Sequence, residues 1–124
     1  MTREGRPVMA FGLMGGDMQP QGHAQVVVNL VDFGMNLQEA GDAIRMHHTG
    51  SSEPTGTVMR DGGVLHIEDG LPAAVIAELR RRGHRIEPEA VGNYGGYQAI
   101  WRDPVTGVYS GATERRKDGC ALGW

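Results

Sequence analysis

One stretch decides the fold: residues 7–17 read Pro7-Val8-Met9-Ala10-Phe11-Gly12-Leu13-Met14-Gly15-Gly16-Asp17. The small and apolar residues at 7–12 predict a buried strand, and the glycines after it predict a turn. Two adjacent glycines lack Cβ atoms, so the backbone can approach a ligand closely. Backbone N–H groups at the start of a following helix can bind an anion or stabilise an oxyanion during acyl transfer. A tight turn that binds nothing is the alternative interpretation of the same residues.

The residues after the turn predict a helix over 20–35. Asp17 is the expected N-cap, which leaves Pro20 in the first turn, where proline is tolerated, and Gly34 is expected to end the helix. A spacing of i, i+3, i+4 and i+7 predicts the apolar face, which consists of Ala24, Val27, Val28 and Val31. The β-branched valines lower the helix propensity, so we expect packing to hold this helix.

Glycine and proline divide the rest of the chain into short elements. Asn36 and Glu39 have the spacing of a capping box, which predicts a second helix that ends at about Ala43. We further expect strands at 44–48, 57–59 and 64–68, a helix from Pro72 to Gly83, and a hairpin of residues 97–102 with 108–112. This order predicts a mixed α+β fold with about three helices, in a single domain over residues 1–124.

The composition excludes several functional classes. A net charge of −3 over 124 residues, with a pI near 5.9, argues against a nucleic-acid partner. The short basic runs at 80–82 and 115–117 are interpreted as solvated surface. Cys120 is the single cysteine, so no disulfide forms within the chain and no cysteine-based metal site is possible. The longest apolar run is far too short to span a membrane. The cellular compartment is left open.

Few other residues suggest chemistry. His47 and His48 are adjacent in an expected strand, where successive side chains point to opposite faces, so they do not chelate one metal ion together. The chain has no glycine-rich nucleotide motif. We therefore expect no metal and no cofactor. Removal of Met1 would expose Thr2 as an N-terminal threonine, a possible nucleophile. The polar segment around Thr2 shows no strand character, which argues against that role.

A family resemblance covers nearly the whole chain. Residues 12–48 resemble the γ-glutamyltranspeptidase family of N-terminal nucleophile hydrolases, and the most specific match is Asn29-Leu30-Val31-Asp32-Phe33-Gly34-Met35-Asn36. Further matches are Gly12–Gly16, Glu39-Ala40, Arg45-Met46-His47-His48 and residues 108–124. The resemblance implies a partial N-terminal nucleophile hydrolase fold, which is a portion of an αββα sandwich.

The resemblance also implies a site and a set of partners. In that family a threonine, exposed by autocatalytic cleavage, attacks a γ-glutamyl amide and a Gly-Gly pair donates its N–H groups to the oxyanion. Gly15 and Gly16 match this pair. The chain would then be the C-terminal segment of the small subunit. Its partners would be the large subunit and the start of the small subunit, which hold the nucleophile and the residues that bind the glutamyl group.

The glycine turn departs from the pattern of common family members, which have Gly-Ser-Pro-Gly-Gly-Ser-Arg where this chain has Gly12-Leu13-Met14-Gly15-Gly16-Asp17-Met18. Asp17 adds a negative charge beside the anion site, which opposes γ-glutamyl specificity. We expect a fragment of a γ-glutamyltransferase or hydrolase, with glutathione-type substrates, that is inactive alone. The alternatives are a non-catalytic domain that forms homo-oligomers, and part of an acylase that acts on another amide. Whether the chain by itself is an enzyme is left open.

Overall fold

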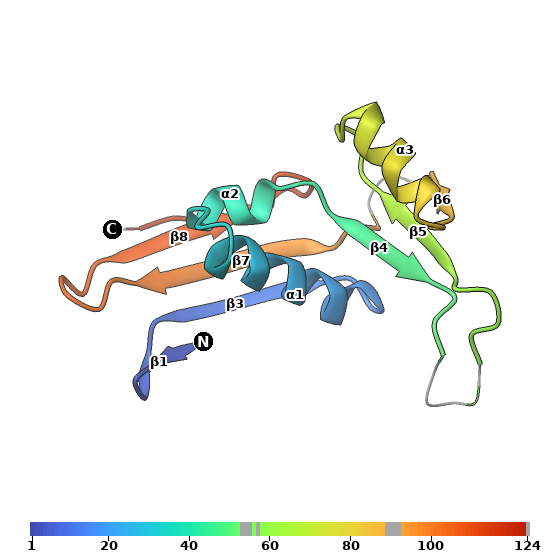
Figure 1. Cartoon of the computed structure of the whole chain (residues 1–124). Coiled ribbons are helices and arrows are strands. Elements are labelled where there is room, and N and C mark those ends of the chain that lie inside the picture. Colours follow the sequence, from blue (N-terminus) through green and yellow to red (C-terminus); the bar gives the residue numbers. More distant parts are fainter. Residues whose placement is uncertain (53–55, 57, 89–92, 124) are drawn as a thin grey trace. The chain divides into compact units, whose positions relative to one another are not determined.

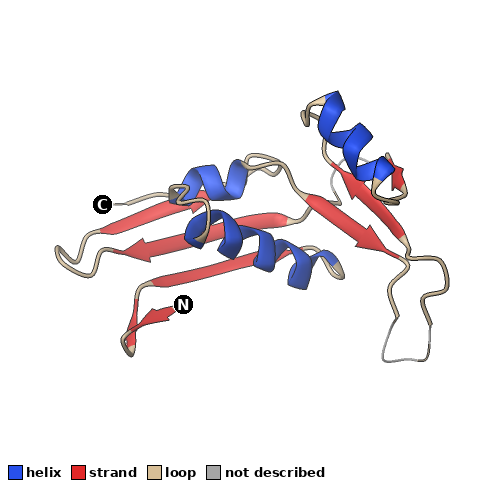
Figure 2. Cartoon of the chain, viewed as in Figure 1, coloured by secondary structure: helices blue, strands red, loops and turns tan. Residues whose placement is uncertain are grey.

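The structure is a computed structural model in which residues 1–52, 56, 58–88 and 93–123 are described. The chain forms two compact units: unit 1 contains residues 1–43 and 95–124, and unit 2 contains residues 44–94. The mixed α+β fold is confirmed, with three helices among the described residues (Figure 2). The single-domain organisation stays a prediction. None of the helices in the described ranges is long and apolar enough to cross a membrane.

Unit 1 is a three-stranded antiparallel sheet with two helices on one face (Figure 1). The strand order is β3-β7-β8, and a short hairpin of β1 and β2 precedes β3. The predicted strand at 7–12 and the predicted hairpin after residue 96 are both present, with bounds shifted by one or two residues. The elements are β1 (Thr2–Arg3), β2 (Arg6–Pro7), β3 (Met9–Met14), α1 (Met18–Val31), α2 (Leu37–Asp42), β7 (Gly96–Arg102) and β8 (Tyr109–Thr113).

Strand β3 is buried on one face only, so the expectation of a buried strand is correct for that face and wrong for the other. Met9 and Leu13 are buried, whereas Ala10 and Met14 are exposed. Strand β7 alternates in the same way, with Tyr97 fully buried between the sheet and the helices. Successive residues of a strand point to opposite faces, and α1 and α2 cover a single face of the sheet.

Helix α1 packs on the sheet through a different face from the predicted one. The buried positions are Met18, Gly22 and Val26, at spacings of four. The predicted face is turned outward, since the exposed fractions of Val28 and Val31 are 41% and 64%. A Cβ at Gly22 would lie 2.6 Å from a methyl carbon of Leu13. The absence of a side chain at Gly22 therefore lets the helix lie close to β3, and this close approach selects the buried face.

The connection between α1 and α2 confirms the predicted capping box. Asn36 accepts hydrogen bonds from the N–H groups of Gln38 and Glu39, and the Glu39 carboxylate accepts from the N–H of Asn36. Gly34 turns the chain between the helices at a φ of 64°. The Asn29 side chain donates to the Ala40 carbonyl at 3.3 Å. Together these contacts fix α2 against the end of α1.

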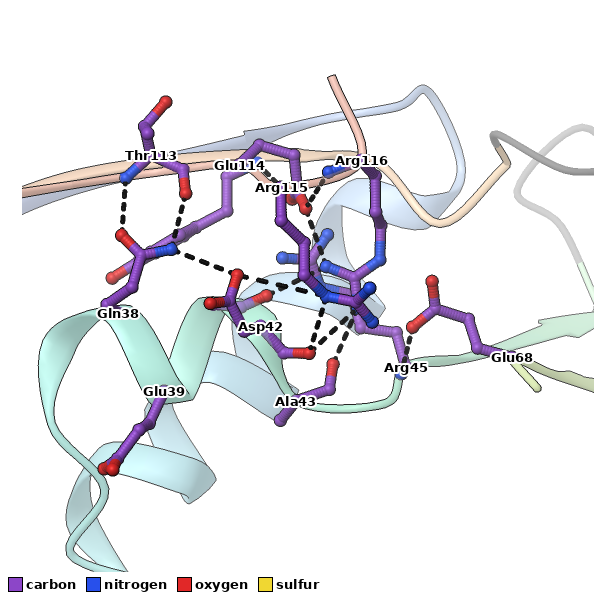
Figure 3. Close-up of polar contacts among 12 residues, drawn as sticks. Gln38, Glu39, Asp42, Ala43, Arg45, Glu68, Thr113, Glu114, Arg115 and Arg116 are labelled. Carbon is purple, nitrogen blue, oxygen red and sulfur yellow. Dashed lines mark hydrogen bonds and ion pairs between the residues drawn. The ribbon is translucent and has the colours of Figure 1, made fainter. Parts of the chain in front are cut away.

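A buried ion pair holds the end of α2 to the sheet (Figure 3). The Arg116 and Glu114 side chains are 9% and 0% exposed, with 2.7 Å between Nη1 and Oε1. The other Glu114 oxygen accepts the N–H of Tyr97, and the Arg116 guanidinium donates to the carbonyls of Gly41 and Ala43 at 2.9 and 2.8 Å. The expectation that the run at 115–117 is solvated is therefore wrong for Arg116, because its guanidinium satisfies the last carbonyls of α2.

The outer edge of β8 is covered at one point by a side chain from α2. The Gln38 amide nitrogen donates to the Thr113 carbonyl at 2.8 Å, and its oxygen accepts the Thr113 N–H at 3.1 Å (Figure 3). Strand β8 pairs with β7 on its inner side. The Gln38 amide thus makes the two bonds that a further strand would make at Thr113.

Unit 2 is a second three-stranded sheet, in the order β4-β5-β6, with one helix. Residues 58 and 59 are not in a strand, so the strand predicted at 57–59 is wrong for these two residues; position 57 lies outside the described residues. Strand β5 pairs instead with β4, and the unpredicted β6 runs parallel to β5. The elements are β4 (Met46–Thr49), β5 (Val64–Ile67), α3 (Ala73–Arg81) and β6 (Ile86–Glu87).

Helix α3 begins and ends as predicted, with Pro72 before it and Gly83 after it at a φ of 95°. Arg81 and Arg82 lie at its C-terminal end, where cations are favourable, and both contact the exposed Glu78 at 2.7 Å. The run at 80–82 is therefore solvated surface, as predicted.

Candidate functional site

The glycine turn joins the end of β3 to the start of α1 (Figure 1). Both glycines have left-handed backbone angles, with φ of 142° at Gly15 and 57° at Gly16. Residues other than glycine rarely adopt a φ near 142°, so the turn requires glycine at position 15. The N–H groups of Met18 and Gln19 donate to the carbonyls of Gly15 and Gly16, both at 3.0 Å. The carbonyls of the turn are therefore held by the first turn of α1.

A close backbone approach also requires glycine at position 15. A Cβ at Gly15 would lie 3.1 Å from the Cα of Gly95, which directly precedes β7. Gly95 itself has a φ of 79°, and a Cβ there would meet Leu13 and the carbonyl of Met14. By contrast, a Cβ at Gly16 would have no atom within 4 Å. The turn is thus packed at Gly15 and open at Gly16.

The backbone N–H groups of the turn are available for a ligand. Among the described residues, neither Gly15 nor Gly16 donates its N–H to another group, and both residues are exposed. They precede a helix of fourteen residues, so the positive end of its dipole adds to their attraction for an anion. Asp17 occupies the N-cap position, but its side chain makes no capping hydrogen bond. The cap predicted at Asp17 is therefore absent, and its exposed carboxylate lies beside the turn.

His23 contacts both sides of the glycine turn, which the sequence did not indicate. The N–H of Leu13 donates to its Nε2 at 3.2 Å, and its Nδ1 lies 2.6 Å from the carbonyl of Gln19. The ring also packs against Phe11, with 5.3 Å between the ring centroids. A histidine within a helix carries no local signal of this role, because its partner at Leu13 belongs to a strand on the other side of the turn.

Strand β1, which contains Thr2, lies at the opposite end of β3 from the glycine turn (Figure 1). Thr2 pairs with Pro7 in the β1–β2 hairpin, so the expectation that this segment lacks strand character is wrong. The hairpin joins the first residue of β3, and six strand residues span about 20 Å. A nucleophile at Thr2 would therefore stand about 20 Å from the N–H groups of Gly15 and Gly16, far beyond bonding distance.

The remaining candidates lie in unit 2 and do not converge. His48 contacts the hydroxyl of Ser51 and the carbonyl of Gly62, both at 2.9 Å. His47 instead faces His66 across the β4–β5 pair, with 6.2 Å between the ring centroids. In the parts of the chain that the structure describes, no three His, Cys, Asp or Glu side chains gather in a group that could hold a metal ion.

Comparison with known proteins identifies the family of this chain. The family model described as gamma-glutamyltranspeptidase matches residues 1–124. The chain belongs to the γ-glutamyltranspeptidase family. Its mixed α+β structure agrees with the solved structures of this group of N-terminal nucleophile hydrolases. The run from Asn29 to Asn36 that carried the resemblance covers the last residues of α1, the connection to α2 and the N-cap of α2, so in this chain it positions helices.

Three relatives of this γ-glutamyltranspeptidase-family chain show the range of similarity. The acylase ACY 1 proenzyme of Pseudomonas sp. (strain SE83) is 37% identical over 94% of this chain and 18% of the relative. The structure of cephalosporin acylase from Bacillus halodurans is 42% identical, with a TM-score of 0.85, over 99% of this chain and 21% of that one. The structure of γ-glutamyltranspeptidase from Pseudomonas nitroreducens, complexed with L-DON, is 25% identical, with a TM-score of 0.81. The match covers 100% of this chain and 59% of that one. The chain spans about a fifth of the length of the curated relatives that it matches.

Proposed function

We propose that this chain supplies the oxyanion-binding glycines of an enzyme that hydrolyses or transfers a γ-glutamyl group. One observation carries the proposal: Gly15 and Gly16 present consecutive N–H groups that donate to no described residue, at the start of α1. Family membership supports it, because the chain belongs to the γ-glutamyltranspeptidase family. The glycines would act on an amide whose other reacting groups come from outside residues 1–124.

In the proposed reaction the turn only has to hold two N–H donors close to the carbonyl oxygen of the substrate. When a threonine oxygen attacks the amide carbon, the carbonyl π electrons move to oxygen and a tetrahedral oxyanion forms. Two N–H donors at hydrogen-bond distance stabilise that charge more than they stabilise the neutral carbonyl, which lowers the barrier. Loss of one such donor costs about 100- to 1,000-fold in kcat. The attacking oxygen loses its proton to the base, and the leaving amine takes a proton when the carbon–nitrogen bond breaks.

The second candidate is an acylase that acts on another amide. The identities over most of this chain favour it, since they are 37% and 42% to the two acylases and 25% to 30% to glutathione hydrolases and γ-glutamyltranspeptidases. The exposed carboxylate of Asp17 also disfavours a substrate that carries its own negative charge close to the turn. Both candidates use Gly15 and Gly16 in the same way and differ only in the acyl group.

Apolar side chains on the surface of unit 1 support a role within a larger assembly. Met14 and Ile100 are 58% and 54% exposed on the sheet face opposite the helices, and Phe33 is 70% exposed after α1. Such surface is typical of an interface. We propose that other parts of a longer protein cover it, and that the chain alone is catalytically inactive and self-associates. A monomer in analytical ultracentrifugation at tens of micromolar would contradict self-association.

The test compares two glycines that have similar φ angles. Gly16 and Gly34 have φ values of 57° and 64°, and a Cβ at either has open space around it. Alanine at each position therefore carries the same backbone strain of about 1–2 kcal/mol. In the full-length gene product, Gly16→Ala should lower kcat about 100-fold, because its methyl group enters the space that the substrate oxygen needs. Gly34→Ala should leave kcat unchanged.

Two results would refute the proposal. Equal effects of Gly16→Ala and Gly34→Ala on kcat would remove the glycine turn from the reaction. Hydrolysis of a γ-glutamyl anilide by residues 1–124 alone, abolished by Thr2→Ala, would place the nucleophile in this chain. The substrate class is decided by assaying a γ-glutamyl anilide beside a butyryl anilide, which lacks both the α-amino and the α-carboxylate group. Preference for the butyryl compound selects the acylase candidate.

A further inference from the structure

Helix α1 carries a histidine that joins the two sides of the glycine turn. Strand β3 is an outer strand of the β3-β7-β8 sheet, so some of its N–H groups face away from β7. The N–H of Leu13 donates to Nε2 of His23 at 3.2 Å. Leu13 lies two residues before Gly15. The imidazole thus holds the strand directly before the turn.

The same ring also holds the helix directly after the turn. Nε2 accepts an N–H, so it carries no proton, and the neutral ring has its hydrogen on Nδ1. That hydrogen is donated to the carbonyl of Gln19, 2.6 Å away. Gln19 lies three residues after Gly16, and its own N–H donates to the Gly16 carbonyl. One side chain therefore spans the turn from Leu13 to Gln19.

The carbonyls of the turn are held by α1 and Gly15 is packed, but the two glycines have no side chains that would fix the direction of their N–H groups. Glycine has more backbone freedom than any other residue, and nothing lies within 4 Å of the position that a Cβ at Gly16 would occupy. The direction of an N–H bond follows the rotation of its peptide plane, and oxyanion stabilisation depends on that direction. The imidazole ring packs against the ring of Phe11, with 5.3 Å between the two ring centroids, and this packing also holds it in place.

We propose that His23 is a positioning residue, which fixes the direction of the Gly15 and Gly16 N–H groups through its bonds to Leu13 and Gln19. This inference rests on the proposed oxyanion role of the two glycines. His23 does not touch the substrate. It acts by keeping the end of β3 and the first turn of α1 at one separation, so that the turn between them has a single conformation.

The first experiment uses the unaltered chain and solution NMR. A scalar coupling across the hydrogen bond between the Leu13 N–H and the His23 Nε2 should be detectable, and the imidazole nitrogen shifts should show the hydrogen on Nδ1. Absence of the coupling, or a hydrogen on Nε2, would overturn the inference whatever the activity of the protein. No substitution is involved, so a variant that fails to fold cannot obscure the result.

The second experiment separates the ring from its hydrogen bonds. His23→Phe keeps the aromatic contact with Phe11 and loses both bonds, whereas His23→Gln keeps an acceptor close to the position of Nε2. The exposed His84, which follows α3 in unit 2, provides the control substitution His84→Phe. His23→Phe should shift the amide resonances of Gly15 and Gly16, His23→Gln should restore them in part, and His84→Phe should leave them unchanged.

Kinetics of the full-length gene product complete the test. His23→Phe should lower kcat by about 10- to 100-fold with KM changed less than about twofold, because misplaced donors weaken only the transition state. His23→Gln should recover much of the loss. If Gly16→Ala lowers kcat but His23→Phe changes neither kcat nor the glycine resonances, this inference alone is wrong. If Gly16→Ala leaves kcat unchanged, the oxyanion proposal is wrong, and the resonances still decide whether His23 holds the turn.

Discussion

Arg115 and Arg116 are adjacent arginines that both contact the end of α2, one from solvent and one from the interior. Arg116→Met removes the guanidinium that pairs with Glu114 at 2.7 Å and that donates to Gly41 and Ala43. Arg115→Met removes a guanidinium that is 52% exposed and donates to the Asp42 carbonyl at 3.1 Å. Methionine keeps most of the aliphatic side chain in each case, so the comparison isolates the charge and its hydrogen bonds.

The expected magnitudes differ because the two sites differ in burial. Removal of Arg116 breaks the ion pair with the fully buried Glu114 carboxylate, and breaking a buried pair in this way costs about 3–5 kcal/mol. An exposed pair such as the one at Arg115 contributes about 0–1 kcal/mol. For a chain of this length, a loss of 3–5 kcal/mol lowers Tm by about 10–20 °C. Arg115→Met should lower Tm by no more than about 4 °C.

Urea unfolding of both variants, followed by circular dichroism, measures the difference directly. The m-values should stay equal, so that the change in midpoint reports the free energy of unfolding. The double variant Glu114→Leu with Arg116→Met removes both charges and should recover part of the loss, because the buried carboxylate is removed together with the guanidinium that pairs with it. If the free energies of unfolding of Arg116→Met and Arg115→Met differ by less than about 1 kcal/mol, the buried pair does not stabilise the fold more than the exposed one.

Three further predictions concern local contacts. Gly41→Ala should destabilise the chain by about 1–3 kcal/mol in urea unfolding, because its Cβ would overlap the ring of Tyr97, although alanine normally favours a helix. Asn36→Ala should cost about 1 kcal/mol by the same measurement, and Asn36→Asp should keep most of that stability. The Thr106 N–H, followed by its hydroxyl, lowers the pKa of Asp103 in the folded chain, so this turn stabilises the fold above about pH 4 and loses that effect as the pH falls through the lowered pKa. An NMR titration of the Asp103 carboxyl carbon should show a midpoint below the ordinary value, and Thr106→Ala should raise it; an unchanged midpoint in that variant would contradict the role of the hydroxyl.

Local signals in the sequence predicted local structure well. The capping box of Asn36 and Glu39 depends on residues three apart, and it is present with both of its hydrogen bonds. The glycine turn and the end of α3 were also predictable from local sequence. A left-handed backbone angle favours glycine, so glycines mark the places where the chain turns. The site could be located from the sequence as far as Gly15 and Gly16, whose chemical role stays a proposal.

Contacts between distant residues were not predictable. The valines of α1 have a helical period, but the period does not say which face meets the sheet, and the absence of a side chain at Gly22 decides it. Nothing in the sequence distinguishes Arg116 from other arginines in a basic run. Its guanidinium is buried because it pairs with the Glu114 carboxylate and donates to carbonyls at the end of α2. His23 is the same kind of case, since its partner at Leu13 is ten residues away.

The glutamine that covers the edge of β8 links the order of unfolding to aggregation. Gln38 and Thr113 are 75 residues apart, so their two bonds exist only while α2 is docked. An opening event that releases α2 without melting the sheet would uncover the N–H and carbonyl of Thr113 together, and an uncovered strand edge is a template for a second chain. The docked α2 helix therefore protects the chain from polymerisation. The rate of hydrogen exchange at the Thr113 amide would measure how often α2 is released.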